Sequence, residues 1–549
     1  MKSLPQSRRK PGPTRAPSTD VARQHHWLRK SPVWKLAKKK RGPAFAATTI
    51  MALLAGCAVG PDYRRPDAPV PVAYKEAGIV WRAARPSDAI DRGAWWSIYR
   101  DPVLDGLERQ IDISNQNLKA AAANFREAEA IVAQARAGFF PTASFNAQAQ
   151  RTRTSGGRVG STGVPGGSSG SISNFFSLTT TASWVPDLWG KVERTVESDV
   201  ASAQASAGDL ASARLAAQGQ LASNYMQLRI SDELKQLLEA SVKAFTESLR
   251  ITRNQLQAGT ADQSAVSQAE AQLENTRAQL IALGVTRAQL EHAIAVLIGK
   301  PPAELSITPV TSTMAIPEIP PELPAALLER RPDIAAAERR MAAANAQIGA
   351  AEAAFFPTVT LSGDYGIQAS MLKRLFNTAS RTWSVGATLT QTLFDAGLRH
   401  AVVEQDRAAY DAAIANYWQT VLTGFQQVED QLAAQRILVG QAAAENAAVA
   451  AAREAERVIT NQYKAGTVAY TNVVIAQTTA LNNAITAANL RQSRLLATVA
   501  LIQALGGGWD ASQIPLREQV EADVPLDFNP LPPADAEPRP ALDWLPKLW

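Results

Sequence analysis

Two kinds of hydrophobic spacing take turns along the 549 residues of this chain. Segments rich in Ala, Glu, Gln and Arg place apolar residues at helical spacing, whereas shorter segments alternate apolar and polar residues as β-strands do. The helical segments are 105–137, 190–257, 263–298, 330–354, 396–464 and 470–505, and the alternating segments lie within 142–184 and 358–393. The pattern predicts an α+β protein in which long helices dominate.

Each alternating segment predicts a β-hairpin with one apolar and one polar face. In the first, Phe145 and Ala147 alternate with Asn146 and Gln148, and a Gly- and Ser-rich loop at 155–173 follows. Strands of about 10–11 residues with this pattern suit a membrane β-strand that has lipid on one face and water on the other. A soluble β-sandwich with one wet face fits the strands equally well.

The longest helical segment of the first half, 190–257, has a coiled-coil pattern. Apolar residues recur along it at multiples of seven positions, at Leu221, Leu228, Val242, Leu249 and Leu256. At 1.5 Å per residue this helix would be about 100 Å long. The segments 105–137 and 263–298 together have nearly the same length. We therefore expect one long helix beside two stacked half-length helices, and the same arrangement around 396–464.

Sequence matches explain why the pattern occurs twice. AGFFPTASF at 137–145 returns as AAFFPTVTL at 353–361, and RNQLQAGTADQSAVSQAEAQL at 253–273 returns as TNQYKAGTVAYTNVVIAQTTAL at 460–481. The offsets of 216 and 207 residues are similar, and the order is kept. Solenoid repeats have periods of about 20–50 residues. The chain therefore contains one large duplicated unit, made of helices and a hairpin.

The basic character of the chain belongs to its N-terminus. Residues 1–56 hold 13 of the 56 Lys and Arg residues and one of the 50 Asp and Glu residues. The remainder has 43 basic and 49 acidic residues, a net charge of −6. A phosphate-binding surface is therefore not indicated, and we expect no nucleic-acid partner.

This basic segment ends in a signal for processing. Basic residues at 35–41 precede an apolar run at 44–56, which at 13 residues is too short to span a bilayer. The run leads into Leu-Ala-Gly-Cys, which resembles the bacterial lipobox, whose cysteine becomes the lipidated N-terminus. Cys57 is the only cysteine of the chain, which excludes disulfides. A free cysteine after an ordinary signal peptide is the alternative.

The lipobox resemblance also implies a destination. Ala58 follows the cysteine where some lipoproteins have an aspartate, and this implies sorting to the outer membrane. The leader is long, and a true start at Val33 would explain its length. No later segment has 18 continuous apolar residues, so we expect no membrane-spanning helix after the leader. An envelope protein of this kind is either only anchored or crosses the membrane as β-structure.

The outer-membrane address favours the membrane hairpin over the sandwich. Trp184 and Trp383 support it, because they lie at strand ends, where aromatic residues gather at membrane interfaces. Four strands cannot close a barrel, and free edges would leave unpaired backbone in hydrocarbon. The chain must therefore oligomerise, at least as a dimer of eight strands or a trimer of twelve. Such an assembly is a polar-lined conduit.

Four further motifs identify a family. They are LLERRPDIAAAERRMAAANAQIGAAEAAFFPTVTLSG (327–363), SWVPDLWGKV (183–192), QTLFDAGLR (391–399) and CAVGPDYRRP (57–66). Together they resemble the outer-membrane efflux lipoproteins of the TolC superfamily, the NodT/OprM type. The resemblance implies a homotrimeric channel-tunnel: a 12-stranded β-barrel with four strands per chain, continuous with a long periplasmic α-helical barrel and a mixed equatorial belt. It also implies a periplasmic adaptor (membrane fusion protein) and an inner-membrane RND-type transporter as partners.

The resemblance assigns roles to individual residues. Cys57 matches the lipidated position, so that a covalent lipid, not a cofactor, is expected, and the outer-membrane lipid is a further partner. Two turns match the periplasmic tip, where the adaptor docks and the pore narrows: Ala258, Gly259 and Thr260, and Ala465, Gly466 and Thr467. A helix-ending glycine is the plain alternative at each turn.

The aperture is expected to depart from the family pattern. Many members have an aspartate in the second tip segment, and Ile475 occupies its place here. A closed mouth would then be apolar or rely on Tyr463, Lys464 and Tyr470. The two turns also differ at one position, where Asp262 in the first corresponds to Ala469 in the second. We expect the gate to lie where the two turns differ in this way.

Catalytic chemistry is not indicated anywhere in the sequence. His292 and His400 lie in separate helical runs without metal-ligand spacing. Arg330-Arg331-Pro332-Asp333 reads as an ordinary helix start. We therefore predict no enzyme but the passive exit duct of a tripartite efflux pump. An exit duct for polypeptides in type I secretion and a non-conducting periplasmic lipoprotein are the alternatives.

The expected organisation follows from these assignments. It comprises a signal peptide (1–56), a lipidated extended or equatorial segment (57–102), repeat 1 (103–300), an equatorial linker (301–328), repeat 2 (329–505) and an equatorial or disordered tail (506–549).

Overall fold

The computed structural model describes residues 59–68, 70–71, 73–76, 94–153, 172–310, 314–317, 319 and 327–522. All of these residues belong to one unit, Cys57–Trp549. The predicted signal peptide, the lipidation site Cys57 with Ala58, and the chain after 522 lie outside the described residues.

The elements follow one another in the same order in both repeats. Repeat 1 contains η1 (Trp95–Tyr99), α2 (Pro102–Ser114), α3 (Gln116–Arg136), β1 (Thr142–Arg153), β2 (Ile172–Trp184), α4 (Lys191–Gln257) and α5 (Gln263–Leu297). Repeat 2 contains α6 (Leu327–Arg330), α7 (Pro332–Ala353), β3 (Thr358–Ala369), β4 (Arg381–Thr390), α8 (Leu398–Lys464) and α9 (Tyr470–Ala504). The short helix α10 (Arg517–Ala522) follows.

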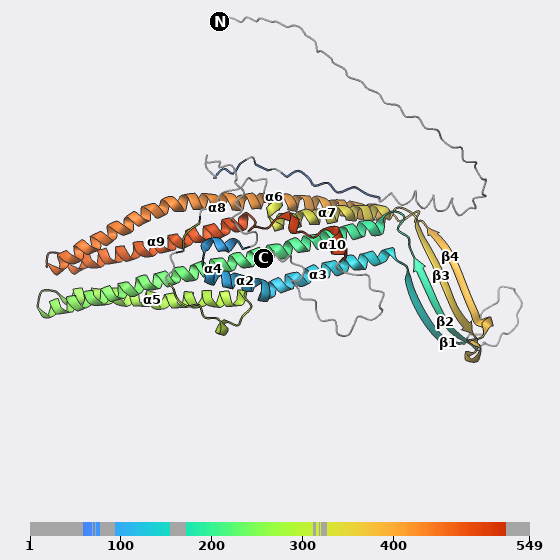
Figure 1. The fold of residues 1–549 in the computed structure, drawn as a ribbon, viewed down its shortest axis with the longest axis horizontal. Helices are drawn as coiled ribbons and strands as arrows, with labels where there is room; N and C mark the ends of the chain where they lie inside the picture. Colours follow the sequence, from blue (N-terminus) through green and yellow to red (C-terminus); the bar gives the residue numbers. More distant parts are fainter. Residues whose placement is uncertain are drawn as a thin grey trace, which may run out of the picture. The chain divides into compact units, whose positions relative to one another are not determined.

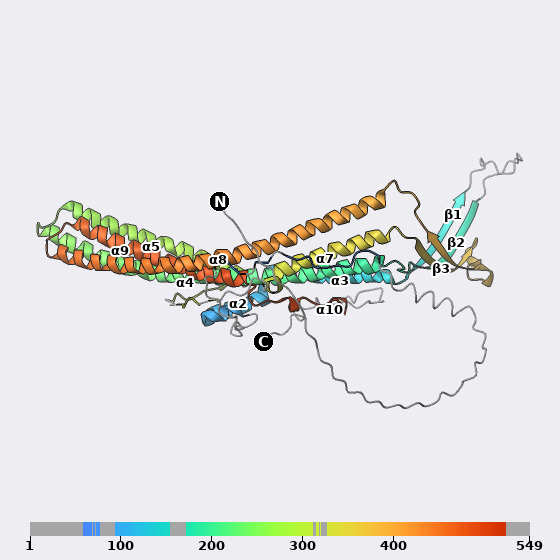
Figure 2. The same cartoon turned by 90° about the horizontal axis from the view of Figure 1, so that it is seen from above.

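Helix α4 is the hub of the unit. The helices α3 and α5 of repeat 1 pack along it, and so do α7 and α9 of repeat 2. The helices α7 and α9 also pack along α8, so that each long helix has two shorter helices beside it. In Figures 1 and 2 the α4–α5 and α8–α9 turns lie together at one end, and the four strands lie at the other.

Small residues let the two repeats approach each other closely. A Cβ atom added at Gly208 of α4 would lie 3.0 Å from the Cβ of Ala336 in α7 and 3.0 Å from the carbonyl oxygen of Pro332. A larger side chain at this crossing would therefore push α4 and α7 apart. The abundance of alanine in the sequence thus reflects close helix packing.

The structure corrects one predicted helix. The sequence predicts one continuous helix over 105–137 because no proline or glycine follows Gly106 within it, but the helix breaks at Asn115 into α2 and α3. The Asn115 side chain accepts a hydrogen bond from the Leu118 amide at 2.9 Å and donates one to the Leu297 carbonyl at 2.7 Å. Asparagine is a strong N-cap residue, and the contact with the end of α5 fixes the break.

The four strands form one antiparallel sheet in the order β1-β2-β3-β4. The register aligns Phe145 with Thr180, Thr180 with Tyr365, and Tyr365 with Trp383. All four residues belong to the face predicted to be apolar, and Phe145, Tyr365 and Trp383 are exposed in the single chain. The alternation in the sequence therefore yields one continuous apolar face across both hairpins.

The opposite face of the sheet is polar, and its two edges are open. On the polar face Ser384 donates a hydrogen bond to the carboxylate of Asp364 at 2.6 Å. Within the described residues, β1 pairs only with β2, and β4 pairs only with β3. In this part of one chain, the backbone along the outer sides of β1 and β4 thus has no strand partner.

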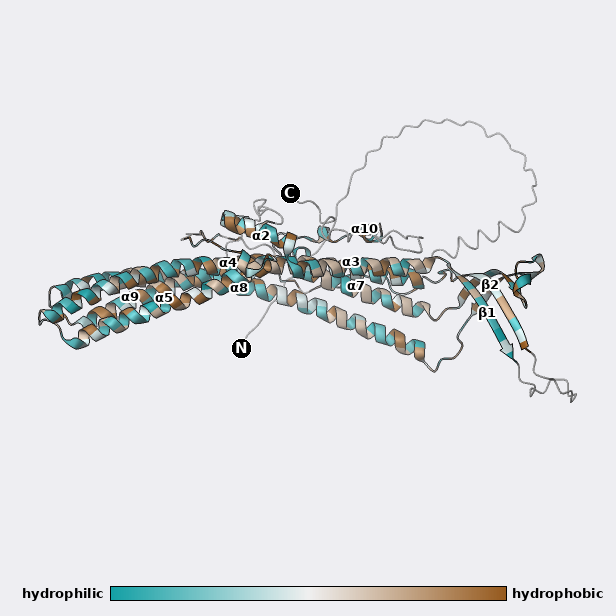
Figure 3. Ribbon diagram, turned by 90° about the horizontal axis from the view of Figure 1, so that it is seen from below, coloured by the Kyte–Doolittle hydropathy of each residue, from teal (hydrophilic) through white to brown (hydrophobic). Residues whose placement is uncertain are grey.

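Helix α5 is long and apolar enough to cross a membrane by length and composition. This differs from the expectation drawn from continuous apolar runs, because mean hydropathy over a window tolerates interspersed polar residues. Figure 3 shows hydrophilic and hydrophobic residues mixed along α5. Its Arg287 donates to Asp232 of α4 at 2.8 Å and to Glu291 at 3.0 Å. The pair with Asp232 joins α5 to α4, whereas the pair with Glu291 lies within α5.

Candidate channel tip and membrane anchor

The turn between α4 and α5 ends the long helix with a left-handed glycine. Gly259 has φ of +72° and follows the C-cap Ala258. The Thr260 amide donates to the Gln255 carbonyl at 2.9 Å, and the Gly259 amide donates to the Leu256 carbonyl at 3.0 Å. This pair of bonds is a Schellman motif.

The turn between α8 and α9 repeats this geometry. Gly466 has φ of +74° and follows the C-cap Ala465. The Thr467 amide donates to the Gln462 carbonyl at 3.0 Å, and the Gly466 amide donates to the Tyr463 carbonyl at 2.9 Å. The three predicted tip residues of each turn are exposed. The helix-ending role of both glycines is thus established in the structure, and docking at these turns stays a prediction.

The two turns differ in how the next helix begins. Asp262 caps α5 and accepts hydrogen bonds from the Ser264 hydroxyl at 2.6 Å and from the Ala265 amide at 2.9 Å. These bonds, that of Ser264 first, lower the pKa of the Asp262 carboxyl. Ala469 stands at the same position before α9 and offers no side-chain cap. The sequence difference therefore has a local structural effect.

Tyr463 and Tyr470 are buried where the two helical hairpins meet. Their ring centroids lie 5.1 Å apart. The Tyr463 hydroxyl donates to the Thr252 hydroxyl of α4 at 3.3 Å. Burial raises the pKa of Tyr470 to about 12, and hydrogen bonds from its neighbours Ser248 and Thr252 oppose this shift. The two tyrosines thus join α8 and α9 to α4.

Two further hydrogen bonds between the hairpins lie nearby. Gln477 of α9 donates to the Ser248 hydroxyl of α4 at 3.1 Å. Thr471 of α9 donates to Gln268 of α5 at 3.1 Å. Sequence reasoning did not single out these residues, although Ser248 and Thr252 lie four residues apart and so share one face of α4.

The remaining candidate aperture residues are not brought into this contact. Lys464 is exposed at the end of α8, and the Ile475 side chain is 60% exposed on α9. His292 on α5 and His400 at the start of α8 lie in different elements. Within the described residues, no group of three or more His, Cys, Asp and Glu side chains could hold a metal ion.

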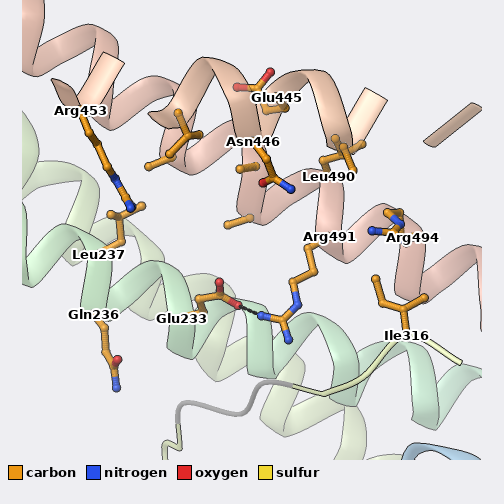
Figure 4. A pocket seen from close by; sticks show the side chains of 15 residues that line it. Glu233, Gln236, Leu237, Ile316, Glu445, Asn446, Arg453, Leu490, Arg491 and Arg494 are labelled. Carbon is orange, nitrogen blue, oxygen red and sulfur yellow. Dashed lines mark hydrogen bonds and ion pairs between the residues drawn. The ribbon is translucent and has the colours of Figure 1, made fainter. Parts of the chain in front are cut away.

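A pocket of about 590 Å³ lies where α4 meets α8 and α9. Figure 4 shows Arg491 of α9 reaching across it to Glu233 of α4. The guanidinium lies 2.9 Å from the Glu233 carboxylate and 3.0 Å from the Met314 carbonyl of the linker. This bridge ties the second hairpin to the first and to the linker, at a distance along α4 from the tip residues.

An N-terminal strap, comprising 59–68, 70–71 and 73–76, runs along the helices. The Val59 amide donates to the Trp189 carbonyl at 3.2 Å, and Arg194 at the start of α4 donates to the Val59 carbonyl at 3.1 Å. A Cβ atom added at Gly60 would lie 2.3 Å from the Cα of Gly349 in α7, so the backbones touch there. The strap is thus fixed beside the junction of β2 and α4.

Side-chain hydrogen bonds hold the rest of the strap. Tyr63 donates to Glu338 of α7 at 2.6 Å, and burial followed by this hydrogen bond raises the pKa of Tyr63. Arg65 donates to the Tyr417 hydroxyl of α8 at 3.0 Å. The strap therefore bridges α7 and α8.

The arrangement of hairpins and sheet in this chain has close counterparts among known proteins. A family model described as "Outer membrane efflux protein" matches residues 108–300 and 323–507. The chain belongs to the outer membrane efflux protein family. Each matched segment spans one of the two repeats. The first runs from α2 to just after α5, and the second ends just after α9.

Individual relatives and solved structures agree with this assignment. The chain is 29% identical over 476 residues to the probable efflux pump outer membrane protein TtgC of Pseudomonas putida, which covers 86% of this chain and 97% of the relative. It is 30% identical over 475 residues to outer membrane protein OprJ of Pseudomonas aeruginosa, covering 86% of this chain and 97% of the relative.

Two solved channels have the same fold. The outer-membrane channel OprN superposes with a TM-score of 0.74 at 30% identity, over 82% of this chain and 100% of that chain. The open state of the MtrE outer membrane channel of Neisseria gonorrhoeae gives 0.73 at 27% identity, over 83% and 99%. The predicted TolC-like fold, the outer-membrane location with a periplasmic extension and the role in efflux are confirmed. As a member of this family, the chain is an outer-membrane component of an efflux system.

Proposed function

We propose that this efflux protein is the passive exit duct of a tripartite pump and works as a homotrimer. The observation that carries this proposal is the four-stranded sheet, which has an apolar face, a polar face and two open edges. Three copies supply twelve strands, and joining β4 of one copy to β1 of the next removes every edge. The apolar face then meets lipid, and the polar face lines the duct.

The helical hairpins supply the periplasmic part of this duct. Their turns, Ala258-Gly259-Thr260 and Ala465-Gly466-Thr467, are exposed and share one backbone geometry. Three chains would present six such turns in a ring. We propose that a periplasmic adaptor docks there and connects the duct to an inner-membrane transporter of the RND type. The aperture would lie within the same ring, with Asp262, Tyr463, Lys464, Tyr470 and Ile475 in its vicinity.

The strap supports lipidation at Cys57. Val59 is bound beside the junction of β2 and α4, and Cys57 precedes it by two residues. Two residues span at most about 7 Å. A lipid attached to Cys57 would therefore be tethered close to the end of strand β2, where the membrane surface lies if the sheet spans the outer membrane. No cofactor is needed in this function.

Small molecules are the proposed cargo. The relatives bear names such as toluene efflux pump outer membrane protein, solvent efflux pump outer membrane protein and antibiotic efflux pump outer membrane protein. These names describe those proteins, and they favour apolar and aromatic small molecules as the first compounds to test here. A passive duct does not need catalytic residues.

Deletion of the gene, followed by susceptibility assays with solvents, aromatic compounds and antibiotics, tests the proposal. We expect the deletion to increase sensitivity to several compounds and the wild-type gene to restore resistance. Cys57→Ala tests the anchor separately, because it should lower the restored resistance while leaving the purified protein trimeric. In parallel, chemical cross-linking in detergent should end at a trimer, and planar bilayers should show conductance.

The alternative functions predict different outcomes. If the protein were a type I secretion duct, deletion of the gene would leave susceptibility unchanged and would lower the amount of a secreted polypeptide instead. A non-conducting structural lipoprotein would give neither conductance nor a trimer. Either result would contradict the exit-duct proposal.

A further inference from the structure

One acidic side chain lies on the buried face of α2. Leu104, Leu107 and Ile111 form the apolar stripe with which this helix enters the core. Glu108 lies between them in the same stripe, and its exposed fraction is 0%. A glutamate is almost never fully buried unless it has a partner.

Glu108 has no such partner among the residues that the structure describes. Both of its carboxylate oxygens are buried and without a hydrogen bond. The carboxyl groups of Asp105 and Asp112, one helical turn away on either side, each have one buried oxygen without a partner as well. The nearby Arg214 of α4 is paired with Asp112, and Arg109 of α2 is exposed. The neighbours on α2 itself are therefore like charges.

Among the described residues, the elements that pack most extensively against α2 supply no compensating charge to Glu108 either. These elements are α4, η1 and α3. Tyr225 of α4 donates to the Asp101 cap at 2.7 Å, Tyr99 of η1 shares a hydrogen bond with α9, and Lys119 of α3 is exposed. None of them forms a hydrogen bond or an ion pair with Glu108 in the described part of the chain.

The carboxyl group of Glu108 is therefore stable in this place only when it is neutral. Burying an unpaired charge is so costly that the group binds a proton instead. Burial, then Asp112, then Asp105 raise the pKa of Glu108 well above its usual value. Because every atom of Glu108 is already covered within one chain, a second copy cannot supply a missing partner.

We propose that a proton on Glu108 holds α2 in the helical bundle and that this contact acts as a latch which weakens as the pH rises. Helix α2 is suited to this role because its C-terminal end is also hydrogen-bonded to the end of α5. There Ser114 donates to the Ile298 carbonyl at 2.5 Å, and the neighbouring Asn115 donates to the Leu297 carbonyl. Helix α2 thus connects the core around Glu108 to the end of α5.

The sign of the pH dependence follows from the neutral form. The pKa of Glu108 is higher in the folded protein than in the unfolded chain. The latch therefore has its full strength when the pH is below the pKa that Glu108 has in the unfolded chain. This strength is lost as the pH rises through the folded value. One group that releases one proton changes the equilibrium by at most about tenfold per pH unit.

Hydrogen exchange of the full trimer in detergent tests the latch. Protection factors for the 104–111 amides, which already correct for the intrinsic pH dependence of exchange, would be measured from about pH 5 to about pH 9. In the wild type we expect protection to fall towards alkaline pH, with a slope up to tenfold per unit. E108Q has the same shape and no proton to lose, so its protection should be independent of pH and higher than wild type at pH 9.

Three further variants sharpen the result. Asp105→Asn removes a like charge, so the fall in protection should move to lower pH. Glu127→Gln changes an exposed carboxylate on α3 and should reproduce the wild-type curve. E108L replaces the acid by an apolar residue and provides a second pH-independent variant if E108Q folds poorly. Protection that is equal at all pH values in the wild type, or that falls equally in E108Q, would overturn the latch.

Discussion

At the scale of single residues, the two helical hairpins are joined near their turns by neutral groups. Tyr463 with Thr252 and Gln477 with Ser248 are hydroxyl and amide pairs, and the ion pair of Arg491 with Glu233 lies farther along α4. A neutral contact of this kind responds little to salt, whereas exposed ion pairs are screened. Opening of the hairpins should therefore depend little on salt.

Removing the hydroxyl pair should loosen the hairpins. We expect Tyr463→Phe or Thr252→Val to cost about 1 kcal/mol, which is about a fivefold change in the ratio of closed to open hairpins. The double variant should cost less than the sum of the two single ones, because both remove the bond between Tyr463 and Thr252. The measurement is the open fraction of single channels in planar bilayers.

A matched control exists on α9. Thr486 is exposed, and among the described residues its hydroxyl bonds only to its own helix, at the Asn482 carbonyl. Thr486→Val should leave the open fraction unchanged. If Thr486→Val raised the open fraction as much as Thr252→Val, loss of any threonine hydroxyl would explain the effect, and the bond to Tyr463 would not.

Residue roles near the turns were only partly predictable. The sequence places Tyr463 and Tyr470 beside the turn, and the structure adds that they are buried against α4. Their partners Ser248 and Thr252 carry no sequence signal beyond a four-residue spacing. Which face of α4 meets the second hairpin depends on packing between segments about 200 residues apart, which local periodicity does not encode.

At the scale of elements, the beginning of α5 and that of α9 form a natural comparison. Both helices follow the same Schellman turn, and only α5 has a side-chain cap. An uncapped helix leaves its first amides without partners. The first turn of α9 should therefore fray more readily than that of α5.

Exchanging the cap should exchange this behaviour. We expect Asp262→Ala to lower the exchange protection of the first turn of α5, and Ala469→Asp to raise that of α9. The lowered pKa of Asp262 means that its contribution is present at neutral pH and is lost as the pH falls through the folded value. Hydrogen exchange at neutral and acidic pH measures both effects, and Asp262→Asn, which keeps a capping oxygen, should retain protection under acid conditions.

The strap depends on two glycines that meet. Gly60 has φ of +105°, and its backbone touches Gly349. We expect Gly60→Ala to cost about 1–3 kcal/mol from the backbone conformation alone, and the contact with α7 adds to this. Limited proteolysis of the strap measures the loss. Gly106→Ala is the control, since its Cβ would meet nothing within 4 Å.

Elements were easier to predict than their ends. Strand alternation indicated which residues share a face, and the register of all three pairings agrees with it. The break at Asn115 was missed because an asparagine within a helical run is ambiguous until its partner, here the end of α5, is known. The strap has no periodicity at all, so its path along α7 and α8 had no sequence signal.

At the scale of the whole molecule, one chain leaves apolar side chains uncovered outside the sheet. On α5, Ile281 is 75% exposed and Val285 is 60% exposed. Four positions separate them, so they lie on one face of the helix. A clustered apolar face on a helix that also carries charged residues indicates a surface covered by another chain, and we expect that chain to be a second copy in the proposed trimer.

Charging this face should weaken the trimer. Covering an exposed Ile or Val contributes about 1.5–3 kcal/mol, and a buried aspartate adds a desolvation cost. We expect the combined change Ile281→Asp and Val285→Asp to shift the purified protein from trimer towards monomer, as measured by cross-linking and sedimentation. Gln279→Asp lies on the same helix two positions before Ile281, on a different face, where it is exposed and already polar, and it should leave the trimer intact. A trimer unaffected by the double change would place α5 outside the interface.

The crossing of Gly60 and Gly349 has a mechanical consequence. A lipid on Cys57 would let the membrane pull on the chain, and the strap would carry that tension first to the corner formed by Trp189, Arg194 and Gly349. This corner adjoins the sheet, whereas the hinge-like turns lie at the other end of α4. Lateral forces from the membrane would thus act near the sheet. The helical hairpins at the other end of α4 could then move without transmitting force to the lipid anchor.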